Sequence, residues 1–547
     1  DIVVYYGPAI NKGLKNGSCF YINKIVGGLA HYPETIFKTP FDEKTIFSSD
    51  EATLTGCGED LADTESALVY SVCCQFFKPY QIFFFKAIGG NESGMGVGHV
   101  DAILKFAKMA HGQINCRKDL LQDGDRLLLG KIAQNLSLSK TNGAYLYKLA
   151  EYGKSKGKGL DIFYKYADIQ PVGKIKGKGL LNEIKDEALG RKYVQKDIVD
   201  NISGYGPGTE NLDDNCQNSF NSPFSHVYIE RGALRYENTA GFLKRFKNSK
   251  IIMVDNYQDI FSKGSFYYQK KSQNLILAVK KGGQVYKGSE YCDSFGNENF
   301  YYTTSIMNCI FDCEYCFLQG MYHSANVVVF VNIEETFSEL EKILKGQDVY
   351  LCISYDTDIL AFESLFHLTR EWVAFASKHK NLKIEVRTKS ANFHLLKDMP
   401  FTPNVIFAWT ISPDLIIKKF EHKTPVLKKR AQDMKLAASL GYKIRVCIDP
   451  LIYIDNFETV YSGFIDDLFS QIESKDILDI SIGVFRVNKA YFKKMKKQRF
   501  ESEVLNYPFE TKSNALSYDG QLKNWMLSFI YKKLCLYVNA EKIFITR

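Results

Sequence analysis

The stretch Asn308 to Gly320, NCIFDCEYCFLQG, places Cys309, Cys313 and Cys316 in the spacing C-x3-C-x2-C. Cysteine thiolates are the usual protein ligands of [4Fe–4S] clusters, which normally take four of them. Three thiolates from one short loop therefore leave the fourth iron without a protein ligand. An open iron can bind a small molecule instead, so the loop predicts a [4Fe–4S] cluster that also takes part in chemistry.

Two other uses of cysteine fit the chain less well. Structural zinc sites take four tetrahedral ligands, commonly from paired C-x2-C units, and the sequence has no second C-x2-C pair. A disulfide framework is disfavoured because the chain is long, its 13 cysteines are odd in number, and no secretory signal is visible. The cluster is the favoured interpretation, and zinc is the alternative.

Composition indicates a globular protein of several domains. A chain of 547 residues exceeds one ordinary core, and its 45% hydrophobic and 24% charged residues are usual for soluble proteins. Its most apolar runs, such as residues 82–85 and 327–331, are too short to cross a bilayer. With no visible export signal, we expect a cytoplasmic protein without a membrane partner.

Basic residues are clustered along the chain. Lysine and arginine number 70 against 62 acidic residues, and they gather in GKSKGKGL (153–160), its near repeat GKIKGKGL (173–180) and FKKMKKQR (492–499). Such groups neutralise backbone phosphates without reading sequence. The clusters predict nucleic acid as a partner, and a solvated surface is the alternative for any one of them.

From about residue 300 onward, strand and helix patterns alternate. Apolar, β-branched runs predict strands at residues 301–305, 326–332, 348–354, 382–388, 405–411, 442–448 and 477–485. Helical spacing predicts helices at residues 334–344, 360–378, 426–440 and 457–473. Strands joined by helices indicate an α/β fold with a parallel, right-handed array, open or partly closed. In such arrays, the chemistry lies at the carboxyl ends of the strands.

Several segments in order resemble the spore photoproduct lyase family of radical S-adenosylmethionine enzymes, which reverse a thymine dimer in spore DNA. They are HVYIE (226–230), CEYCFLQ (313–319), TDILAFE (357–363), RTKS (387–390), WTISPDLIIKKFEHKT (409–424) with Arg430, and ASLGYKIRVCIDPLI (438–452). The resemblance covers about residues 222–547. It implies a partial (β/α)6 TIM barrel.

The resemblance also implies how cofactors are used. The open iron binds S-adenosyl-L-methionine, and one electron from a reductant such as flavodoxin or ferredoxin splits the sulfonium to give a 5′-deoxyadenosyl radical. Lys389 and Thr410 match positions that face this cofactor, and we assign Thr357 the same role. Asp449, which precedes Pro450 at a strand end, is a candidate contact for the nucleoside. A surface lysine, an ordinary strand threonine and a turn are the alternatives.

Two positions depart from the family. The cysteine that returns hydrogen to the substrate radical aligns with Tyr355, and the nearest thiol is Cys352. The tyrosine that relays hydrogen aligns with Phe317, which has no O–H group. Tyr355 and Tyr315 are therefore the candidate radical relay, and Cys352 is the nearest alternative donor.

Residues 1–106 show a weaker resemblance to the carboxyl half of the nucleoside phosphorylase and nucleosidase family. It starts at LADTESA (61–67), which an apolar helix, a strand and a Gly-rich loop follow. The resemblance implies that Glu65 holds ribose hydroxyls, although glycine replaces the catalytic Asp of the family. We interpret the loop at residues 89–99 as a connection rather than a phosphate cradle, and His99 as structural.

The domain organisation follows from these patterns. We expect a nucleoside phosphorylase-like fragment at residues 1–110, a helical basic segment at 111–200, a linker at 201–221 and a radical S-adenosylmethionine domain at 222–547. The linker is rich in Gly, Asn and Asp.

The leading hypothesis is a radical S-adenosylmethionine lyase that acts on nucleic acid or a pyrimidine photoproduct, as in DNA repair. The basic and aromatic segment that starts at Arg486 and ends at Tyr518 is the candidate nucleic-acid clamp, with a plain surface helix and turn as the alternative. Two other functions stay open. One is radical modification of a small nucleoside or peptide, and the other is a non-catalytic nucleic-acid-binding protein with a structural cluster.

Overall fold

The protein, described by a computed structural model, divides into two compact units. The larger contains Asp1–Lys118, Phe224–Phe500 and Phe509–Arg547, and the smaller contains Asp119–Pro223 and Glu501–Pro508. The structure describes residues 3–9, 19–27, 29–31, 42–48, 61–63, 69, 82–88, 102–109, 120–156, 159–188, 224–261, 266–288 and 293–546. Outside these residues lie Glu65, the Gly-rich loop at 89–99 with His99, and the linker expected at 201–221.

The amino-terminal residues form a mixed sheet in the order β1-β6-β2-β4-β5, with β3 paired to β2. Its strands are β1 (Val3–Ala9), β2 (Cys19–Gly27), β3 (Leu29–His31), β4 (Asp42–Ser48), β5 (Leu61–Asp63) and β6 (Ile82–Ile88). Strand β6 confirms the strand expected before the Gly-rich loop. Phe83 and Phe85 of β6 are fully buried, and the ring of Phe85 lies 5.3 Å from that of Tyr21.

The smaller unit is helical, as its sequence indicates. It contains α3 (Asp123–Asn135), α4 (Lys140–Ser155), α5 (Asp161–Ala167), α6 (Lys174–Ala188) and α18 (Glu503–Asn506). Leu129, Ile132 and Leu146 are fully buried in its core. The ring of Tyr152 lies 5.2 Å from that of Tyr507, so a segment late in the chain completes this unit.

The two lysine-glycine repeats occupy opposite helix ends. The first copy begins in the last turn of α4, whereas the second copy opens α6 at Lys174. Gly177 is buried at a close approach, where a Cβ atom would lie 1.7 Å from the carbonyl oxygen of Leu136. Only glycine fits there, so one copy of the repeat has a packing role in addition to its charge.

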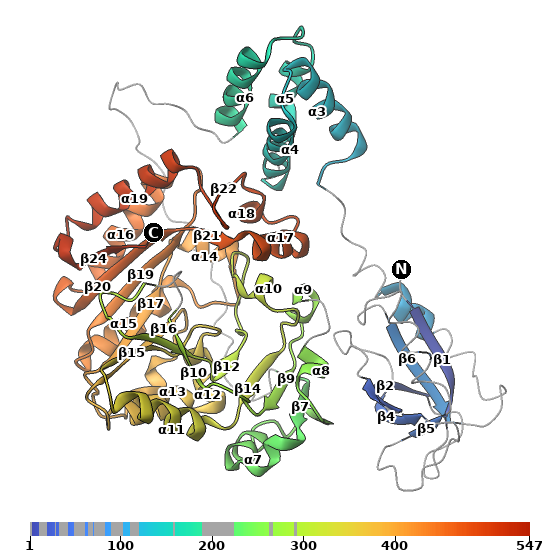
Figure 1. Cartoon of the computed structure of the whole chain (residues 1–547), viewed down its shortest axis with the longest axis vertical. Coiled ribbons are helices and arrows are strands. Elements are labelled where there is room, and N and C mark those ends of the chain that lie inside the picture. Colours follow the sequence, from blue (N-terminus) through green and yellow to red (C-terminus); the bar gives the residue numbers. More distant parts are fainter. Residues whose placement is uncertain are drawn as a thin grey trace, which may run out of the picture. The chain divides into compact units, whose positions relative to one another are not determined.

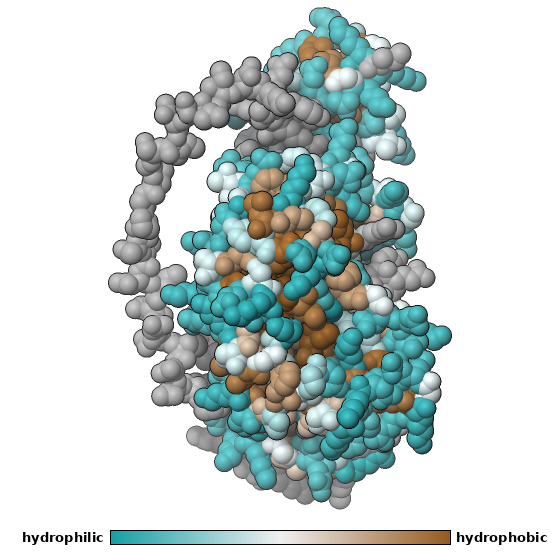
Figure 2. Space-filling view, turned by 90° about the vertical axis from the view of Figure 1, so that its left-hand side faces the viewer, coloured by the Kyte–Doolittle hydropathy of each residue, from teal (hydrophilic) through white to brown (hydrophobic). Residues whose placement is uncertain are grey.

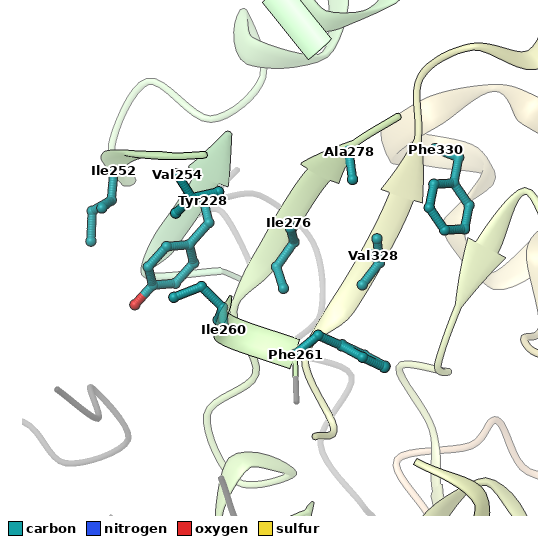
Figure 3. Close-up of a cluster of buried hydrophobic side chains, with 9 residues drawn as sticks. All are labelled: Tyr228, Ile252, Val254, Ile260, Phe261, Ile276, Ala278, Val328 and Phe330. Carbon is teal, nitrogen blue, oxygen red and sulfur yellow. The ribbon is translucent and has the colours of Figure 1, made fainter. Parts of the chain in front are cut away.

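In the larger unit, residues 226–330 contribute a five-stranded sheet in the order β12-β14-β9-β7-β8. Its strands are β12 (Ile306–Met307), β14 (Val327–Phe330), β9 (Leu275–Ala278), β7 (His226–Glu230) and β8 (Lys250–Val254). Every residue of β7, β9 and β14 is buried, which fits a mainly parallel sheet covered on both faces. Figure 3 shows nine buried side chains that pack together on one side of this sheet.

A second sheet has eight strands. Neighbouring strands pair in parallel, except that β10 pairs with β11 in the antiparallel direction. Its strands in order are β10 (Val285–Lys287), β11 (Phe300–Thr303), β15 (Val349–Cys352), β16 (Leu382–Thr388), β17 (Val405–Thr410), β19 (Ile444–Leu451), β20 (Ile477–Val484) and β24 (Ile543–Ile545). The fold is therefore mixed α/β with parallel sheets. The strand expected at residues 326–332 forms, but as β14 it joins the five-stranded sheet rather than this one.

Helices connect these strands and lie along the outside of the sheet (Figure 1). They are α11 (Ile333–Leu344), α13 (Leu368–Ala376), α15 (Leu427–Ser439), α16 (Phe457–Gln471) and α19 (Gly520–Leu534). Gly441 follows α15 with φ of +93°, as expected of a glycine stop. The single helix expected at residues 360–378 is wrong, because His367 adopts φ of +55° and separates α12 (Glu363–Phe366) from α13.

The surface of the described residues carries no membrane-spanning element. None of their helices combines the length and the apolar character that a bilayer crossing requires. Figure 2 shows a face on which apolar residues gather in a central band with hydrophilic residues around it. Exposed large apolar side chains of the larger unit include Leu415, Val426, Trp525 and Leu536.

Candidate active site

The cysteine loop is fixed by hydrogen bonds at its first residue. Asn308 has φ of +66°, and its side-chain amide donates to the carbonyl oxygens of Ser324 and Asn326, both at 2.8 Å. The Thr357 hydroxyl donates to the Asn308 carbonyl at 2.8 Å. These contacts hold the loop at the carboxyl ends of β12 and β15, where the sequence places the chemistry.

A short antiparallel pairing holds the middle of the loop. Strand β13 (Asp312–Cys313) pairs with β18 (Glu421–His422), so that Cys313 lies opposite Glu421. The Glu314 amide donates to the Phe420 carbonyl at 2.9 Å, and His422 Nε2 lies 2.8 Å from Glu314 Oε1. The segment that follows β17 and α14 (Asp414–Phe420) therefore clamps the cysteine loop.

The three sulfurs have the surroundings of cluster ligands. All three are free thiols, and burial raises the pKa of the Cys309 thiol to about 12 and that of the Cys313 thiol well above its ordinary value. Each thiol lies within electrostatic range of another, and the Phe311 amide donates to Cys309 Sγ at 3.4 Å. Thiolates here need nearby positive charge, which a bound metal would supply.

The three sulfurs do not form a site for one metal ion. Among the residues that the structure describes, no three His, Cys, Asp or Glu side chains gather closely enough to hold one metal ion. A cubane cluster does not require three ligands around one ion, because each of its cysteines binds a different iron atom. The buried Lys270 side chain donates to the carbonyl oxygen of Cys309; burial lowers its pKa, and the nearby Cys309 and Asp312 side chains oppose that change.

A buried charge network adjoins the loop. Glu421 Oε1 accepts from the Lys389 ammonium at 2.8 Å, and Glu421 Oε2 accepts from Arg430 Nη2 at 2.6 Å. Although burial alone would raise it, these two cations lower the pKa of the Glu421 carboxyl to about 2. The Tyr315 hydroxyl donates to the same carboxylate and accepts from Lys389 at 2.8 Å. Glu421 is therefore ionised at neutral pH and positions both Lys389 and Tyr315.

Glu421→Ala is expected to destabilise the larger unit by about 3–5 kcal/mol, because it leaves Arg430 buried without its carboxylate. Arg430 is 0% exposed, and its other partners are the oxygens of Thr410, Thr424 and Pro425. The measurement is urea unfolding followed by tryptophan fluorescence. All three tryptophans of the chain, Trp372, Trp409 and Trp525, lie in this unit.

The matched control for that measurement is Asp398→Ala. Asp398 pairs with Arg370 at 2.8 Å, but its side chain is 67% exposed. Exposed pairs contribute up to about 1 kcal/mol, so this change is expected to shift the unfolding free energy little. Equal losses in the two variants would contradict the role given to burial at Glu421.

The residues expected to bind the cofactor lie at neighbouring strand ends. Lys389 directly follows β16, and Thr410 is the last residue of β17. The two strands pair in parallel, from Ile384 opposite Val405 to Thr388 opposite Trp409. The Thr410 side chain is not part of the charge network described above. Its backbone carbonyl, however, accepts a hydrogen bond from Arg430 Nη1 at 3.0 Å. Thr357 lies one residue before Asp358, which the sequence did not single out.

Asp358 ties the ends of two strands together. It is buried, and its carboxylate accepts from the Thr388 hydroxyl at 2.7 Å, the Lys389 amide at 2.5 Å and the Ala361 amide at 3.1 Å. Burial raises the pKa of this carboxyl, whereas these bonds lower it. The TDILAFE segment contained the only sequence signal for this residue.

Tyr355 lies in a row of aromatic rings beside the cysteine loop. Its ring centroid is 4.5 Å from that of Tyr302 and 6.0 Å from that of Phe317, which directly follows Cys316. The Tyr302 ring stacks at 5.3 Å on Tyr286, whose side chain reaches the surface. The sequence predicted Tyr355 as part of a relay but missed Tyr302 and Tyr286.

Cys352 occupies a different position from Tyr355. It is buried within β15, where it pairs in register with Tyr302 on one side and Glu385 on the other. The Cys352 and Cys447 thiols both lie within electrostatic range of the half-buried Arg387 guanidinium. Cys352 is therefore part of the sheet and is the last residue of β15.

Arg486 and Asp449, expected to contact substrate and cofactor, bind each other. The two Arg486 nitrogens lie 2.9 and 3.1 Å from the two Asp449 carboxylate oxygens. Gly483 makes room for this pair, because a Cβ atom there would lie 2.8 Å from Arg486 and 2.9 Å from Asp449. A carboxylate has more lone pairs than these two bonds use, so Asp449 can still accept a further hydrogen bond.

Comparison with known proteins extends this picture. A model of the family described as spore photoproduct lyase matches residues 223–523. The spore photoproduct lyase of Bacillus subtilis (strain 168) is 24% identical over 292 residues, covering 52% of this chain and 82% of that protein. That of Geobacillus sp. (strain Y412MC61) is 23% identical over 218 residues, covering 39% of this chain and 62% of its own length.

Solved structures resemble the same region. A spore photoproduct lyase mutant with bound AdoMet and dinucleoside spore photoproduct matches with a TM-score of 0.50 at 17% identity, covering 60% of this chain and 99% of that one. Another spore photoproduct lyase mutant matches with a TM-score of 0.51, also at 17% identity, with the same coverage. These similarities establish the fold. The family model begins at residue 223, so the nucleosidase-like character of residues 1–106 stays a prediction.

Proposed function

This chain belongs to the spore photoproduct lyase family, and on that premise we propose that it is a radical S-adenosylmethionine lyase that acts on a pyrimidine photoproduct in nucleic acid. The observation that carries the proposal is the pairing of Cys313 with Glu421, which joins the cysteine loop to the charge network of Lys389 and Arg430. We interpret the eight-stranded sheet as the partial (β/α)6 barrel expected of the family.

The chain offers separate residues for cluster and cofactor. Cys309, Cys313 and Cys316 would hold the [4Fe–4S] cluster, whose reduced form supplies the electron that splits S-adenosylmethionine into methionine and a 5′-deoxyadenosyl radical. Lys389, Thr410 and Thr357 would contact S-adenosylmethionine, because they follow or end neighbouring strands, and Asp449, near the carboxyl end of β19, is a further candidate. Bound AdoMet in a solved spore photoproduct lyase structure supports the choice of this cofactor.

Tyr355 is our candidate for the hydrogen donor that ends the reaction. Its phenolic O–H bond would break as a C–H bond forms on the substrate radical, leaving a phenoxyl radical on Tyr355. The contact with the Tyr302 ring at 4.5 Å supports this role, because it provides a neighbouring oxidisable ring. Tyr315 is less suited, since its hydroxyl is committed to Glu421.

A basic surface is our candidate for the nucleic-acid contact. Strands β21 (Arg486–Asn488), β23 (Ala515–Ser517) and β22 (Glu510–Lys512) form a three-stranded sheet within the segment expected to act as a clamp. Burial lowers the pKa of Lys523, and so do the nearby charges of Arg486 and Lys512. Arg486 is paired with Asp449, so Lys512 and Lys523 are the cations here that would attract a phosphate.

The test is a reductive cleavage assay of the anaerobically reconstituted protein with S-adenosylmethionine and ultraviolet-irradiated DNA. We expect 5′-deoxyadenosine together with repaired thymine. Turnover of a free nucleoside or peptide without DNA would instead favour radical modification of a small substrate. Absence of 5′-deoxyadenosine from the reduced, cluster-loaded protein would leave only the non-catalytic binding protein.

A further inference from the structure

Helix α17 (Lys489–Gln498) is strongly basic and contains no acidic residue. Its sequence is KAYFKKMKKQ, in which Lys493, Lys494 and Lys497 are exposed and Met495 is fully buried. The buried methionine anchors the helix, so the three lysines form a fixed cationic face on the larger unit. The name cationic face is used below for Lys493, Lys494 and Lys497.

The helix is packed directly on the segment that follows the cluster cysteines. A Cβ atom on Gly320 would lie 2.6 Å from the Cα and carbonyl oxygen of Tyr491, so the backbones of α10 (Leu318–Met321) and α17 are in contact. The Gln498 side chain donates to the Gln319 carbonyl at 3.0 Å. Replacing Gly320 by any larger residue would separate the two helices.

Arg499, just beyond the helix, connects it to the cysteine loop itself. Its Nε donates to Gln319 Oε1 at 2.8 Å, and its Nη2 pairs with Asp312. Burial raises the pKa of the Cys316 thiol, and the Arg499 guanidinium is among the charges that oppose this rise. The cationic face is therefore joined, through Gln498 and Arg499, to Gln319 and Asp312 in the cysteine loop.

From these contacts we propose that the cationic face of α17 docks the one-electron reductant, a small redox protein with an acidic surface. The inference rests on the proposed function, which requires one electron per cleavage. The reductant loses one electron, the cluster gains it, and no bond or proton is exchanged between the two proteins. Charge complementarity would speed the encounter at low salt and lose effect as salt rises.

The location favours an electron donor over nucleic acid as the occupant. An electron donor needs only to approach the cluster, and α17 packs on the cluster segment. A nucleic acid must deliver its lesion to Tyr355, at the carboxyl end of β15. Lys512 of β22 and Lys523 of α19 offer other cations to phosphates, whereas Arg486 is already paired with Asp449.

The test uses full-length, reconstituted protein and a flavodoxin reduced to its hydroquinone. The triple variant Lys493→Glu, Lys494→Glu, Lys497→Glu is expected to slow reduction of the cluster by flavodoxin at low salt about tenfold or more, with the difference shrinking as salt is added. The readout is loss of iron–sulfur absorbance in a stopped-flow instrument. Reduction by dithionite, which needs no docking, is expected to be unchanged, and a Lys→Gln triple variant should give an intermediate rate.

The control is a triple charge reversal on another helix of the same unit. Lys428, Lys429 and Lys435 of α15 are also exposed, so changing them to Glu alters net charge equally. If this variant slows flavodoxin as much, net charge explains the effect and the proposal is overturned. Unchanged flavodoxin kinetics with weaker binding of a DNA duplex would also overturn it, in favour of nucleic acid on α17.

A failure of the proposed lyase function can be distinguished from a failure of the docking proposal. If dithionite reduces the cluster of the unmodified protein but no 5′-deoxyadenosine forms, the lyase proposal fails while the docking measurement still stands. If dithionite reduces no cluster at all, both proposals fail together.

Discussion

The Cys313→Ala protein is expected to show no iron–sulfur absorbance after reconstitution and to form no 5′-deoxyadenosine. Cys313 is 7% exposed and lies in the middle of the loop, where β13 pairs with β18. Without its sulfur the loop has two thiolates left, half the usual complement of a cubane. Absorbance and electron paramagnetic resonance of the reduced protein measure the first effect, and chromatography of the reaction mixture measures the second.

Cys535→Ala is the matched control for this experiment. Cys535 is an exposed free thiol at the end of α19 and has no part in the loop. This variant is expected to keep the iron–sulfur absorbance and the cleavage of S-adenosylmethionine. A Cys313→Ala protein that retains the absorbance, or that binds zinc in its place, would remove the basis for a three-cysteine cluster.

Tyr355→Phe is expected to keep cleavage of S-adenosylmethionine but to yield no repaired product. Phenylalanine preserves the ring contacts with Tyr302 and Phe317, so the site retains its shape. It lacks the O–H group from which hydrogen would return to the substrate radical. The measurement compares 5′-deoxyadenosine with repaired thymine in single-turnover reactions on irradiated DNA.

Two companion variants separate Tyr355 from the other candidates. Cys352→Ala is expected to keep product formation, because Cys352 is buried within β15. Tyr315→Phe is expected to keep it as well, although loss of the bond to Glu421 would weaken the charge network. Normal product from Tyr355→Phe with none from Cys352→Ala would transfer the donor role to Cys352.

Local signals allowed much of the fold to be predicted. The glycine stop at Gly441 and the apolar strands β16, β17, β19 and β20 each carry their own pattern, and each forms within a few residues of its expected bounds. Residues 326–332 also form a strand, but a fully buried apolar run contains no information about which of two sheets it joins. His367 adopts a left-handed backbone conformation and interrupts an expected helix, although no glycine in the sequence marks that position.

The candidate site, like the fold, could be predicted only in part. The spacing of Cys309, Cys313 and Cys316 is contained in one short segment, so sequence alone points to it. Glu421 lies in a segment that the sequence had marked by resemblance, yet its role depends on two cations from other elements, Lys389 and Arg430. Long-range contacts of this kind leave no local pattern. The same reason explains why α17 was read only as part of a basic run.

The β13–β18 ladder would couple the binding of a cluster at Cys313 to the order of the chain around residue 421. A group bound at Cys313 would stabilise the ladder, and the ladder in turn would stabilise that bound group, since linkage is reciprocal. Insertion of iron at Cys313 should therefore protect the β18 segment from proteases, and its removal by a chelator should expose Lys423 to trypsin. The cutting rate at that one peptide bond would then report how much of a preparation carries its cluster.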